Sequence, residues 1–261
     1  MVSPNTQWEV GTPPHEYFCT QCQDENGFLV ASSTGQSVWR QCSCVERKRI
    51  ARLYKSSSIS AAMQSVGFDD YLTQDRPRCV SQAKSMAYYF ASHFSDLRGK
   101  RKNSMAIVGE LGSGKTTILH AVSNSLIKQG ILVHYFPWVS GTNELRGAFA
   151  RGNSDKAYEL VERLASAEVL FIDDLLQGRA EPTEYQKDLL YDVVNERYSH
   201  HRPLLISSNL TFEQINKVNE VIGSRIYEMC ADFTTVMRLE ADEQDMDLNF
   251  RLLNAKTWEG N

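Results

Sequence analysis

The chain lacks the features of exported and membrane-embedded proteins. No apolar run approaches the length of about 18 residues that a membrane helix needs, and the first ten residues, MVSPNTQWEV, contain neither a basic leader nor an apolar stretch. Charge of one sign is also missing, because 28 basic residues face 32 acidic ones for a net charge of −4. We therefore expect a cytoplasmic protein with no membrane partner and no global bias towards nucleic acid.

The chain contains six cysteines, and the compartment expected here bears on their chemical state. Six cysteines in a cytoplasmic chain favour thiols or metal ligands over disulfides. The remaining composition, 42% hydrophobic and 23% charged, is ordinary for a globular protein. The length of 261 residues permits one large domain, or a core of about 180 residues with a smaller appendage.

The most informative stretch is a glycine loop between a predicted strand and a predicted helix. The pattern G-x-x-x-x-G-K-T runs from Gly109 to Thr116 and is a Walker A sequence. Apolar residues 105–108 precede it, and apolar residues recur at helical spacing over 118–127. Gly112 and Gly114 permit positive φ, so that successive backbone N–H groups can point at phosphate oxygens beside the helix N-terminus.

Two side chains of this loop have the chemistry that ATP binding requires. Lys115 is placed to reach the β and γ phosphates, and the Thr116 hydroxyl to bind Mg²⁺. The alternative is a Gly/Ser turn between a strand and a helix, with a solvated lysine. Because a chance match would lack the flanking strand and helix, we predict a site for ATP and Mg²⁺.

A second motif, VLFIDD over 169–174, predicts a buried strand that ends in two carboxylates. Parallel strands of α/β sheets are apolar and bind ligands at their carboxyl ends, so both acids should emerge beside the glycine loop. Asp173 then fits the Walker B role of holding Mg²⁺, and Asp174 fits the role of orienting or deprotonating the attacking water. The alternative is that the two acids cap the next element.

Two polar residues further along extend the predicted site. Asn209 ends the apolar strand 203–209, where an amide can hold the hydrolytic water or sense the γ-phosphate; otherwise Asn209 caps a helix at Thr211. Arg225 lies on a predicted helix over 222–229 and can serve the nucleotide of a neighbouring subunit, where it would stabilise charge on the γ-phosphate. A surface arginine is the alternative.

Four cysteines form two closely spaced pairs, Cys19 with Cys22 and Cys42 with Cys44. The residues between the pairs alternate in polarity and include glycines, which predicts two knuckles joined by a hairpin. Four thiolates from such turns make a closed tetrahedral site, for which zinc is the favoured metal. Zinc would also stabilise a segment that is too short to fold on a core of its own. The alternatives are four free thiols, or His15 as a ligand.

A basic segment follows the cysteines. Residues 40–55 hold six basic residues and one acid with apolar residues between them, which is typical of the solvated face of a connecting helix or of a contact with phosphate backbone. The serine-rich residues 56–60 are expected to form a linker. The basic residues 98–102 are expected to form a short exposed loop.

The remaining chain predicts alternating helices and strands. Apolar residues at helical spacing predict helices over 80–97 and 182–198, and apolar runs predict strands over 131–136 and 233–239. A loop followed by a helix is expected over 137–151. This order indicates an α/β protein.

The glycine loop, the IDD strand, the SSN strand and the GSRI helix, over residues 68–251, together resemble the AAA+ ATPases of the DnaC/DnaI helicase-loader family and their IstB transposition-helper relatives. The cysteine pairs and the later SVGFDDY resemble the metal-bearing N-terminal domains of such loaders. The resemblance implies a three-layer P-loop sandwich with a five-stranded parallel sheet and little or no C-terminal lid. It also implies a small N-terminal zinc-binding domain.

The resemblance also implies roles for residues of this chain. Residues 173–174 match Walker B, Asn209 matches sensor 1, and Arg225 matches the arginine finger. Arg251, in DLNFR, is similar to the sensor 2 position, and Arg197 matches a further family position. The Walker A residues that the resemblance assigns to the nucleotide are Gly109, Gly112, Ser113, Gly114, Lys115, Thr116 and Thr117.

For function, the resemblance implies a slow, partner-stimulated ATPase that loads a hexameric DnaB-type replicative helicase onto single-stranded DNA and self-associates in the ATP state. Residues 1–55 would form the helicase-interaction domain, 56–67 a linker and 68–261 the ATPase domain. An IstB-like transposition helper on duplex DNA is the alternative. A P-loop kinase has less support, because a lid and substrate arginines are not evident near the loop. An adaptor in which zinc and ATP are only structural also stays open.

Overall fold

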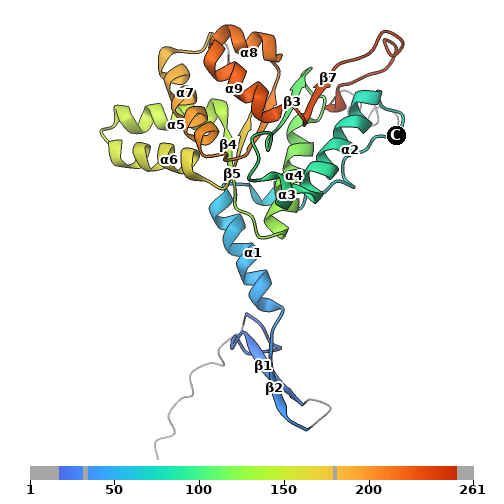
Figure 1. The fold of residues 1–261 in the computed structure, drawn as a ribbon, viewed down its shortest axis with the longest axis vertical. Coiled ribbons are helices and arrows are strands. Elements are labelled where there is room, and N and C mark those ends of the chain that lie inside the picture. The colour runs from blue at the N-terminus through green and yellow to red at the C-terminus, as the bar shows by residue number, and fades with distance from the viewer. Residues whose placement is uncertain (1–17, 32–34, 179–180, 252–261) are drawn as a thin grey trace, which may run out of the picture. The chain divides into compact units, whose positions relative to one another are not determined.

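The computed structural model describes residues 18–31, 35–178 and 181–251, so that His15 lies outside the described residues. The chain divides into two compact units, Met1–Ala51 and Arg52–Asn261, which we call the N-terminal unit and the core unit (Figure 1). The division falls inside helix α1 (Cys44–Ser57). Among the described residues, no helix is long and apolar enough to cross a membrane.

The N-terminal unit contains a two-stranded antiparallel hairpin of β1 (Gly27–Ala31) and β2 (Ser37–Gln41). A Cβ atom at Gly27 would overlap the ring of Trp39 on β2, so a larger residue here would displace this exposed indole. Asn26, just before β1, has a φ of 65°, a conformation that asparagine tolerates in turns. The predicted hairpin is confirmed.

The core unit is built on a five-stranded parallel sheet in the order β4-β5-β6-β3-β7, which confirms the predicted sheet. Because every strand runs in the same direction, the carboxyl ends of β3, β5 and β6 meet at one edge. Every residue of β5 and β6 is buried, as expected for apolar strands with helices on both faces. The strands are β3 (Met105–Gly109), β4 (Val133–Pro137), β5 (Val169–Asp173), β6 (Leu204–Ser208) and β7 (Thr234–Met237).

Helices cover both faces of this sheet (Figure 1). α2 and α4 pack on one side, and α5 to α9 lie on the other side. On the second side, apolar residues of the strands form one cluster with Leu190, Val193 and Val194 of α7. The helices are the short 3-10 turn η1 (Ala61–Met63), α2 (Arg78–Ser92), α3 (Phe94–Leu97), α4 (Lys115–Lys128), α5 (Trp138–Ala150), α6 (Ser154–Ser166), α7 (Glu184–Ser199), α8 (Phe212–Val218) and α9 (Glu220–Cys230).

Two local predictions differ from the structure, and one helix has no counterpart among the predictions. The helix expected over 80–97 is divided at His93, whose φ of −108° and ψ of 12° interrupt the helical backbone. Helix α5 begins at Trp138 directly after β4, without the expected loop, and its Trp138 and Leu145 side chains are buried. Helix α6 was not predicted at all.

The basic residues 98–102 form the predicted exposed loop, and three of them make contacts with other segments. Arg98 forms an ion pair with Glu168 at 2.9 Å, and Lys102 forms one with Asp232 at 2.8 Å. Arg101 lies over the ring of Tyr198 and donates to the carbonyl oxygen of that residue. These contacts link the chain before β3 to the segment before β5, to the end of α7 and to the turn after α9.

Candidate nucleotide site and cysteine centre

The glycine loop between β3 and α4 has the backbone geometry of a phosphate cradle. Gly112 and Gly114 have φ angles of 79° and 88°, which side-chain-bearing residues rarely adopt. At Gly114 an added Cβ atom would lie 2.8 Å from the ring of Tyr71 and 3.0 Å from that of Phe250. Ser113 is buried, and its hydroxyl donates to the carbonyl of Glu110 at 2.7 Å. The Ser113 hydrogen bond therefore stabilises the loop internally, and the rings of Tyr71 and Phe250 pack against its outer side.

Lys115 begins α4 and is folded back against the loop. Its Nζ donates to the carbonyl oxygens of Gly109 at 3.0 Å and Glu110 at 2.6 Å. Only 4% of the residue is exposed, and this burial lowers the pKa of Lys115 to about 8. The ammonium group thus rests on two carbonyl oxygens, from which an anion can draw it away.

The carboxyl end of β5 brings the first predicted acid to the start of α4. The Thr116 hydroxyl donates to Oδ1 of Asp173 at 2.8 Å, and the Ser207 hydroxyl donates to the same oxygen at 2.5 Å. The Tyr135 hydroxyl donates to Oδ2 at 3.0 Å. Motif reasoning missed Tyr135 and Ser207, although both occupy predicted strands beside β5.

The second predicted acid, Asp174, follows β5 with a φ of 56°. Its backbone N–H donates to the Ser207 hydroxyl at 2.7 Å, which supports this left-handed conformation. Burial, and then the charge of Asp173, raise the pKa of Asp174. The Gln177 amide lies beside it and donates to its two oxygens at 2.9 and 3.0 Å once the amide nitrogen is turned towards them.

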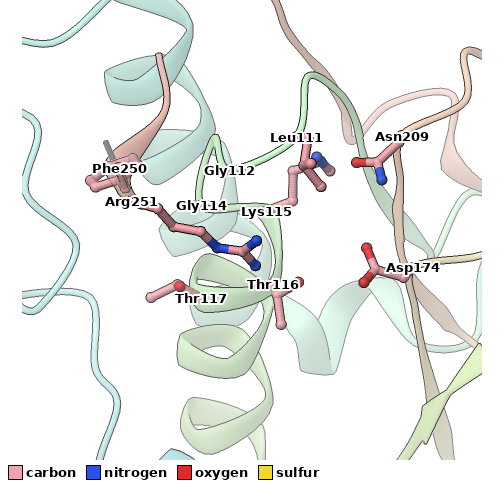
Figure 2. A pocket seen from close by; sticks show the side chains of 10 residues that line it. All are labelled: Leu111, Gly112, Gly114, Lys115, Thr116, Thr117, Asp174, Asn209, Phe250 and Arg251. Carbon is pink, nitrogen blue, oxygen red and sulfur yellow. The ribbon is translucent and has the colours of Figure 1, made fainter. Parts of the chain in front are cut away.

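A polar pocket opens where these elements meet (Figure 2). Figure 2 shows Asp174 and Asn209 on one side, and Arg251 reaching across from the other side towards the start of α4. The pocket holds about 510 Å³ of space that is continuous with solvent. Its lining residues are Leu111, Gly112, Gly114, Lys115, Thr116, Thr117, Asp174, Asn209, Phe250 and Arg251.

Asn209 follows β6, and its side-chain oxygen is buried without a hydrogen-bond partner among the described residues. It does not cap α8. Thr211 performs that role, because its hydroxyl accepts from the Gln214 N–H at 3.3 Å while the Gln214 side chain accepts from the N–H of Thr211. An unpaired amide oxygen that faces the pocket is a ready acceptor for a water molecule.

A segment far along the chain closes one side of the pocket. The Phe250 N–H donates to the Gly112 carbonyl at 2.9 Å, and the Phe250 ring lies 5.4 Å from that of Tyr71. The Arg76 guanidinium lies over the Phe250 ring, 3.7 Å from its centroid, and donates to the Leu248 carbonyl. These contacts place Arg251 at the pocket. Tyr71 and Phe250 were not predicted as site residues, although each lies in a quoted motif, SVGFDDY or DLNFR.

Two predicted arginines lie elsewhere. Arg225 is not among the residues that line this pocket; its guanidinium lies 5.7 Å from the ring of Tyr191 and 5.3 Å from that of Tyr198. Arg197 is fully buried, and burial lowers its pKa to about 9. It donates to carbonyl oxygens of Leu164, Ala165, Ala167 and Pro203, so its contacts are structural.

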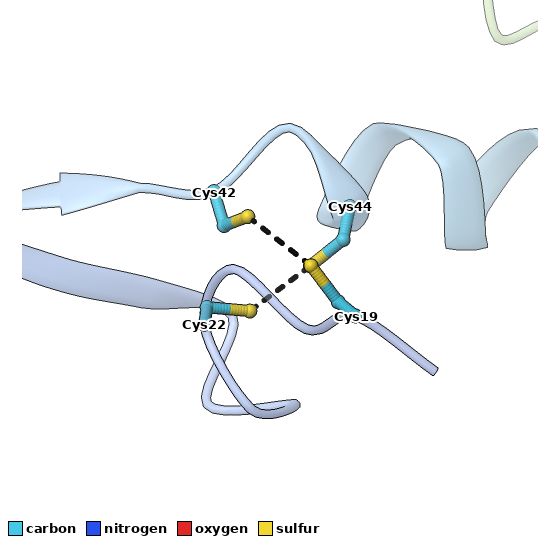
Figure 3. Close-up of side chains that lie close together, drawn as sticks. All are labelled: Cys19, Cys22, Cys42 and Cys44. Atoms are coloured by element: carbon cyan, nitrogen blue, oxygen red, sulfur yellow. Dashed lines mark hydrogen bonds between the residues drawn. The ribbon is translucent and has the colours of Figure 1, made fainter. Parts of the chain in front are cut away.

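The four predicted cysteines converge in the N-terminal unit (Figure 3). Their Sγ atoms all lie within 4.8 Å of one another, with Cys19 3.7 Å from Cys42 and Cys22 3.4 Å from Cys44. A tetrahedral zinc–thiolate site with bonds of about 2.3 Å requires sulfurs about 3.8 Å apart. All four residues are buried, and the cluster is compatible with zinc.

A network outside the sulfurs supports this cluster. The N–H groups of Phe18 and Cys19 donate to the Asp24 carboxylate, and Lys48 forms an ion pair with Asp24 at 3.0 Å. The pKa of Cys19 is lowered to about 6, chiefly by the backbone N–H of Cys22. Burial raises the pKa of Cys44 to about 12, so Cys19 loses its proton more readily than Cys44 does.

The chain is similar to known proteins in sequence and in fold. The family model of IstB-like ATP-binding proteins matches residues 44–225. XkdC of the phage-like element PBSX in Bacillus subtilis (strain 168) is 37% identical over 240 residues, or 90% of this chain and 86% of XkdC. The replicative helicase loader DnaC of Escherichia coli (strain K12) is 24% identical over 182 residues, or 69% of each chain. A crystal structure of the DnaC helicase loader shares the fold, with a TM-score of 0.58 and 21% identity over 69% of this chain and 100% of that one.

Proposed function

The chain belongs to the family of IstB-like ATP-binding proteins and is an AAA+ ATPase, and from that premise we propose that it loads a hexameric DnaB-type replicative helicase onto single-stranded DNA. The observation that carries the proposal is the similarity of its nucleotide core to the E. coli helicase loader DnaC. A four-cysteine unit precedes this core and would contact the helicase. Such a loader would act in the cytoplasm. ATP acts as a switch if the two nucleotide states differ in affinity for the helicase and for DNA.

In this proposal the glycine loop binds the triphosphate. Gly112 and Gly114 have the positive φ angles that turn N–H groups inwards, and the N-terminus of α4 adds a favourable dipole. Lys115 would leave the carbonyl oxygens of Gly109 and Glu110 for the β and γ phosphates. The Ser113 hydroxyl stabilises the loop by donating to the Glu110 carbonyl, and Thr117 lines the pocket.

Thr116 and Asp173 would hold Mg²⁺, because their oxygens lie 2.8 Å apart beside the loop and are the hard ligands that this ion prefers. When bound, Mg²⁺ neutralises charge on the phosphates. Asp174 lines the pocket and would orient or deprotonate the attacking water, a task helped by its raised pKa. Asn209, with its unpaired oxygen, would hold the same water or sense the γ-phosphate.

Two arginines would complete the site. Arg251 lines the pocket and would contact the phosphates of the same subunit. Arg225 lies outside it, which fits a role at the nucleotide of a neighbouring subunit when the protein self-associates with ATP bound. Hydrolysis, slow alone and stimulated by partners, would then reset the assembly after the helicase has been placed.

We further propose that Cys19, Cys22, Cys42 and Cys44 hold a structural Zn²⁺. The four buried sulfurs have the spacing of a closed site that leaves no position for a substrate. The role of this unit would be to contact the helicase, and the metal would keep it folded. The basic residues of α1 leave a contact with DNA phosphates open as a second role for this helix.

Size-exclusion chromatography of the full chain with the replicative helicase of its host tests the loader. A stable complex that forms with ATP and changes on hydrolysis is the expected result. A protein that binds ATP but never co-elutes with the helicase would contradict the loader. The variant Lys115→Ala is the matched control, because it removes the phosphate contact and leaves the four-cysteine unit unchanged.

The alternative function is that of a transposition helper on duplex DNA, which the match to the IstB-like model favours. That match begins at Cys44 and therefore leaves the other three cysteines outside it. A helper would bind duplex DNA at least as tightly as single-stranded DNA and would stimulate a transposase. Affinities for both kinds of DNA at one stated salt concentration separate the two functions.

A further inference from the structure

Three hydroxyl groups surround the carboxylate of Asp173, which is only 6% exposed. Oδ1 accepts from Thr116 at 2.8 Å and from Ser207 at 2.5 Å, and Oδ2 accepts from Tyr135 at 3.0 Å. Thr116 belongs to the predicted Mg²⁺ site, whereas the other two hydroxyls come from strands with no assigned part in the chemistry. Both oxygens of this acid are thus fixed before any metal arrives.

Tyr135 reaches Asp173 because of the sheet register. β4 pairs directly with β5, so that Tyr135 stands opposite Phe171 and Pro137 stands opposite Asp173. Tyr135 is therefore diagonal to Asp173 on the same face of the sheet. Its ring packs 4.9 Å from His120 and 5.1 Å from Phe171. The ring is held by this packing, which aims the hydroxyl at the carboxylate.

Ser207 has a different position in the network. Its hydroxyl donates to Asp173 and also accepts from the N–H of Asp174 at 2.7 Å. Removal of this hydroxyl would disturb both acids and the left-handed backbone of Asp174. Tyr135 has Asp173 as the partner of its hydroxyl, so its contribution can be measured separately.

We propose that Tyr135 is a positioning residue for the Mg²⁺ site. Its hydroxyl holds Oδ2 of Asp173, so that the carboxylate stays directed at the metal beside Thr116. This inference rests on the proposed nucleotide site. Without the phenol, Oδ2 loses its donor and only the Oδ1 contacts with Thr116 and Ser207 orient the carboxylate. Part of the Mg²⁺ binding free energy is then spent on holding that orientation. Partners of metal ligands commonly change metal affinity in this way.

The experiment compares full-length wild type, Tyr135→Phe and the matched control Tyr158→Phe, whose side chain is exposed on α6. Binding of a fluorescent ATP analogue is followed as Mg²⁺ is titrated, and again with a chelator in place of Mg²⁺. For Tyr135→Phe the half-saturating Mg²⁺ concentration rises about tenfold. Nucleotide affinity in the chelator and the melting temperature stay at the wild-type values, and the control behaves like wild type throughout.

Two outcomes overturn the inference alone. One is a half-saturating Mg²⁺ concentration equal to that of wild type. The other is an equal loss of affinity with Mg²⁺ and with chelator, together with a lower melting temperature, because that pattern belongs to a packing residue. A wild type without Mg²⁺-dependent nucleotide binding overturns both the site and the inference. If the Mg²⁺ shift is found but no helicase binds, only the loader function fails.

Discussion

Lys115 carries a positive charge that is poorly solvated in the free site and that a bound anion would stabilise. The side chain is almost fully buried and rests on two carbonyl oxygens, yet burial outweighs these contacts and lowers its pKa to about 8. Near neutral pH most molecules carry the ammonium form, but at a cost in desolvation. A polyphosphate that replaces the carbonyl oxygens would remove that cost and favour the charged form.

The pKa of Lys115 therefore predicts proton uptake on ATP binding. At about pH 8 roughly half of the free molecules carry neutral Lys115, and the bound phosphates raise its pKa, so binding takes up about half a proton. At about pH 7 the uptake falls to about a tenth, because the group is already charged in the free protein. Calorimetry in buffers of different ionisation enthalpy measures both values. Equal heats in all buffers at the higher pH would contradict the role given to Lys115.

Arg197 represents the opposite case, a charged residue whose partners are all structural. Its guanidinium joins the end of α6 to the start of β6 through buried carbonyl oxygens. We expect Arg197→Ala to lower the free energy of unfolding by about 3–5 kcal/mol, since those oxygens lose their donors and a cavity remains. Urea denaturation measures this loss. Arg163→Ala, at an exposed position on α6, should stay within about 0.5 kcal/mol of wild type.

At the scale of elements, the glycine loop depends on a segment that follows β7. Gly114→Ala would force a φ of 88° on alanine and press its Cβ against Tyr71 and Phe250. We expect nucleotide affinity to fall more than about tenfold and stability to fall by about 1–3 kcal/mol. Binding of a fluorescent nucleotide and thermal melting test this. Gly99→Ala, which meets no atom within 4 Å, is the control and should change neither quantity.

Elements with one dominant signal could be predicted from the sequence. β3, β5 and β6 are short apolar runs that end at glycine, aspartate or a polar pair, and each was placed within about two residues. α6 was missed although its sequence carries a helical signal. Its residues Ala157, Leu160, Val161 and Leu164 have the i, i+3, i+4, i+7 spacing of one apolar face, and all four pack on the core. The division at His93 is a backbone feature without a glycine or proline to indicate it.

The residues of the candidate site also divide into those that the sequence could predict and those that it could not. Motif spacing predicted the loop, the two acids, Asn209 and the cysteines, and the structure brings each set together. Tyr135 and Phe250 could not be predicted, because their roles come from strand register and from a contact between distant parts of the chain. A single hydroxyl on a strand has no periodic signal, so its partner becomes apparent only in three dimensions.

At the scale of the whole molecule, the two units are stabilised by different means. The core unit has a buried five-stranded sheet with helices on both faces, which is sufficient for a stable domain. The described part of the N-terminal unit has a hairpin with an exposed β2 and a small cluster around the four cysteines. A unit of that size needs a metal or another cross-link to fold.

This difference predicts that metal and nucleotide act on separate parts of the molecule. The purified chain should contain one zinc per molecule, and Cys42→Ser should lose it, because three thiolates hold zinc less tightly than four. We expect the variant to lose helicase binding while Mg²⁺-dependent nucleotide affinity stays within about twofold of wild type. Metal analysis, co-elution and nucleotide titration on one preparation measure all three. Cys79→Ala, outside the cluster, should retain zinc and helicase binding. A zinc-free variant that still binds the helicase would show that the partner is recognised by the core unit instead.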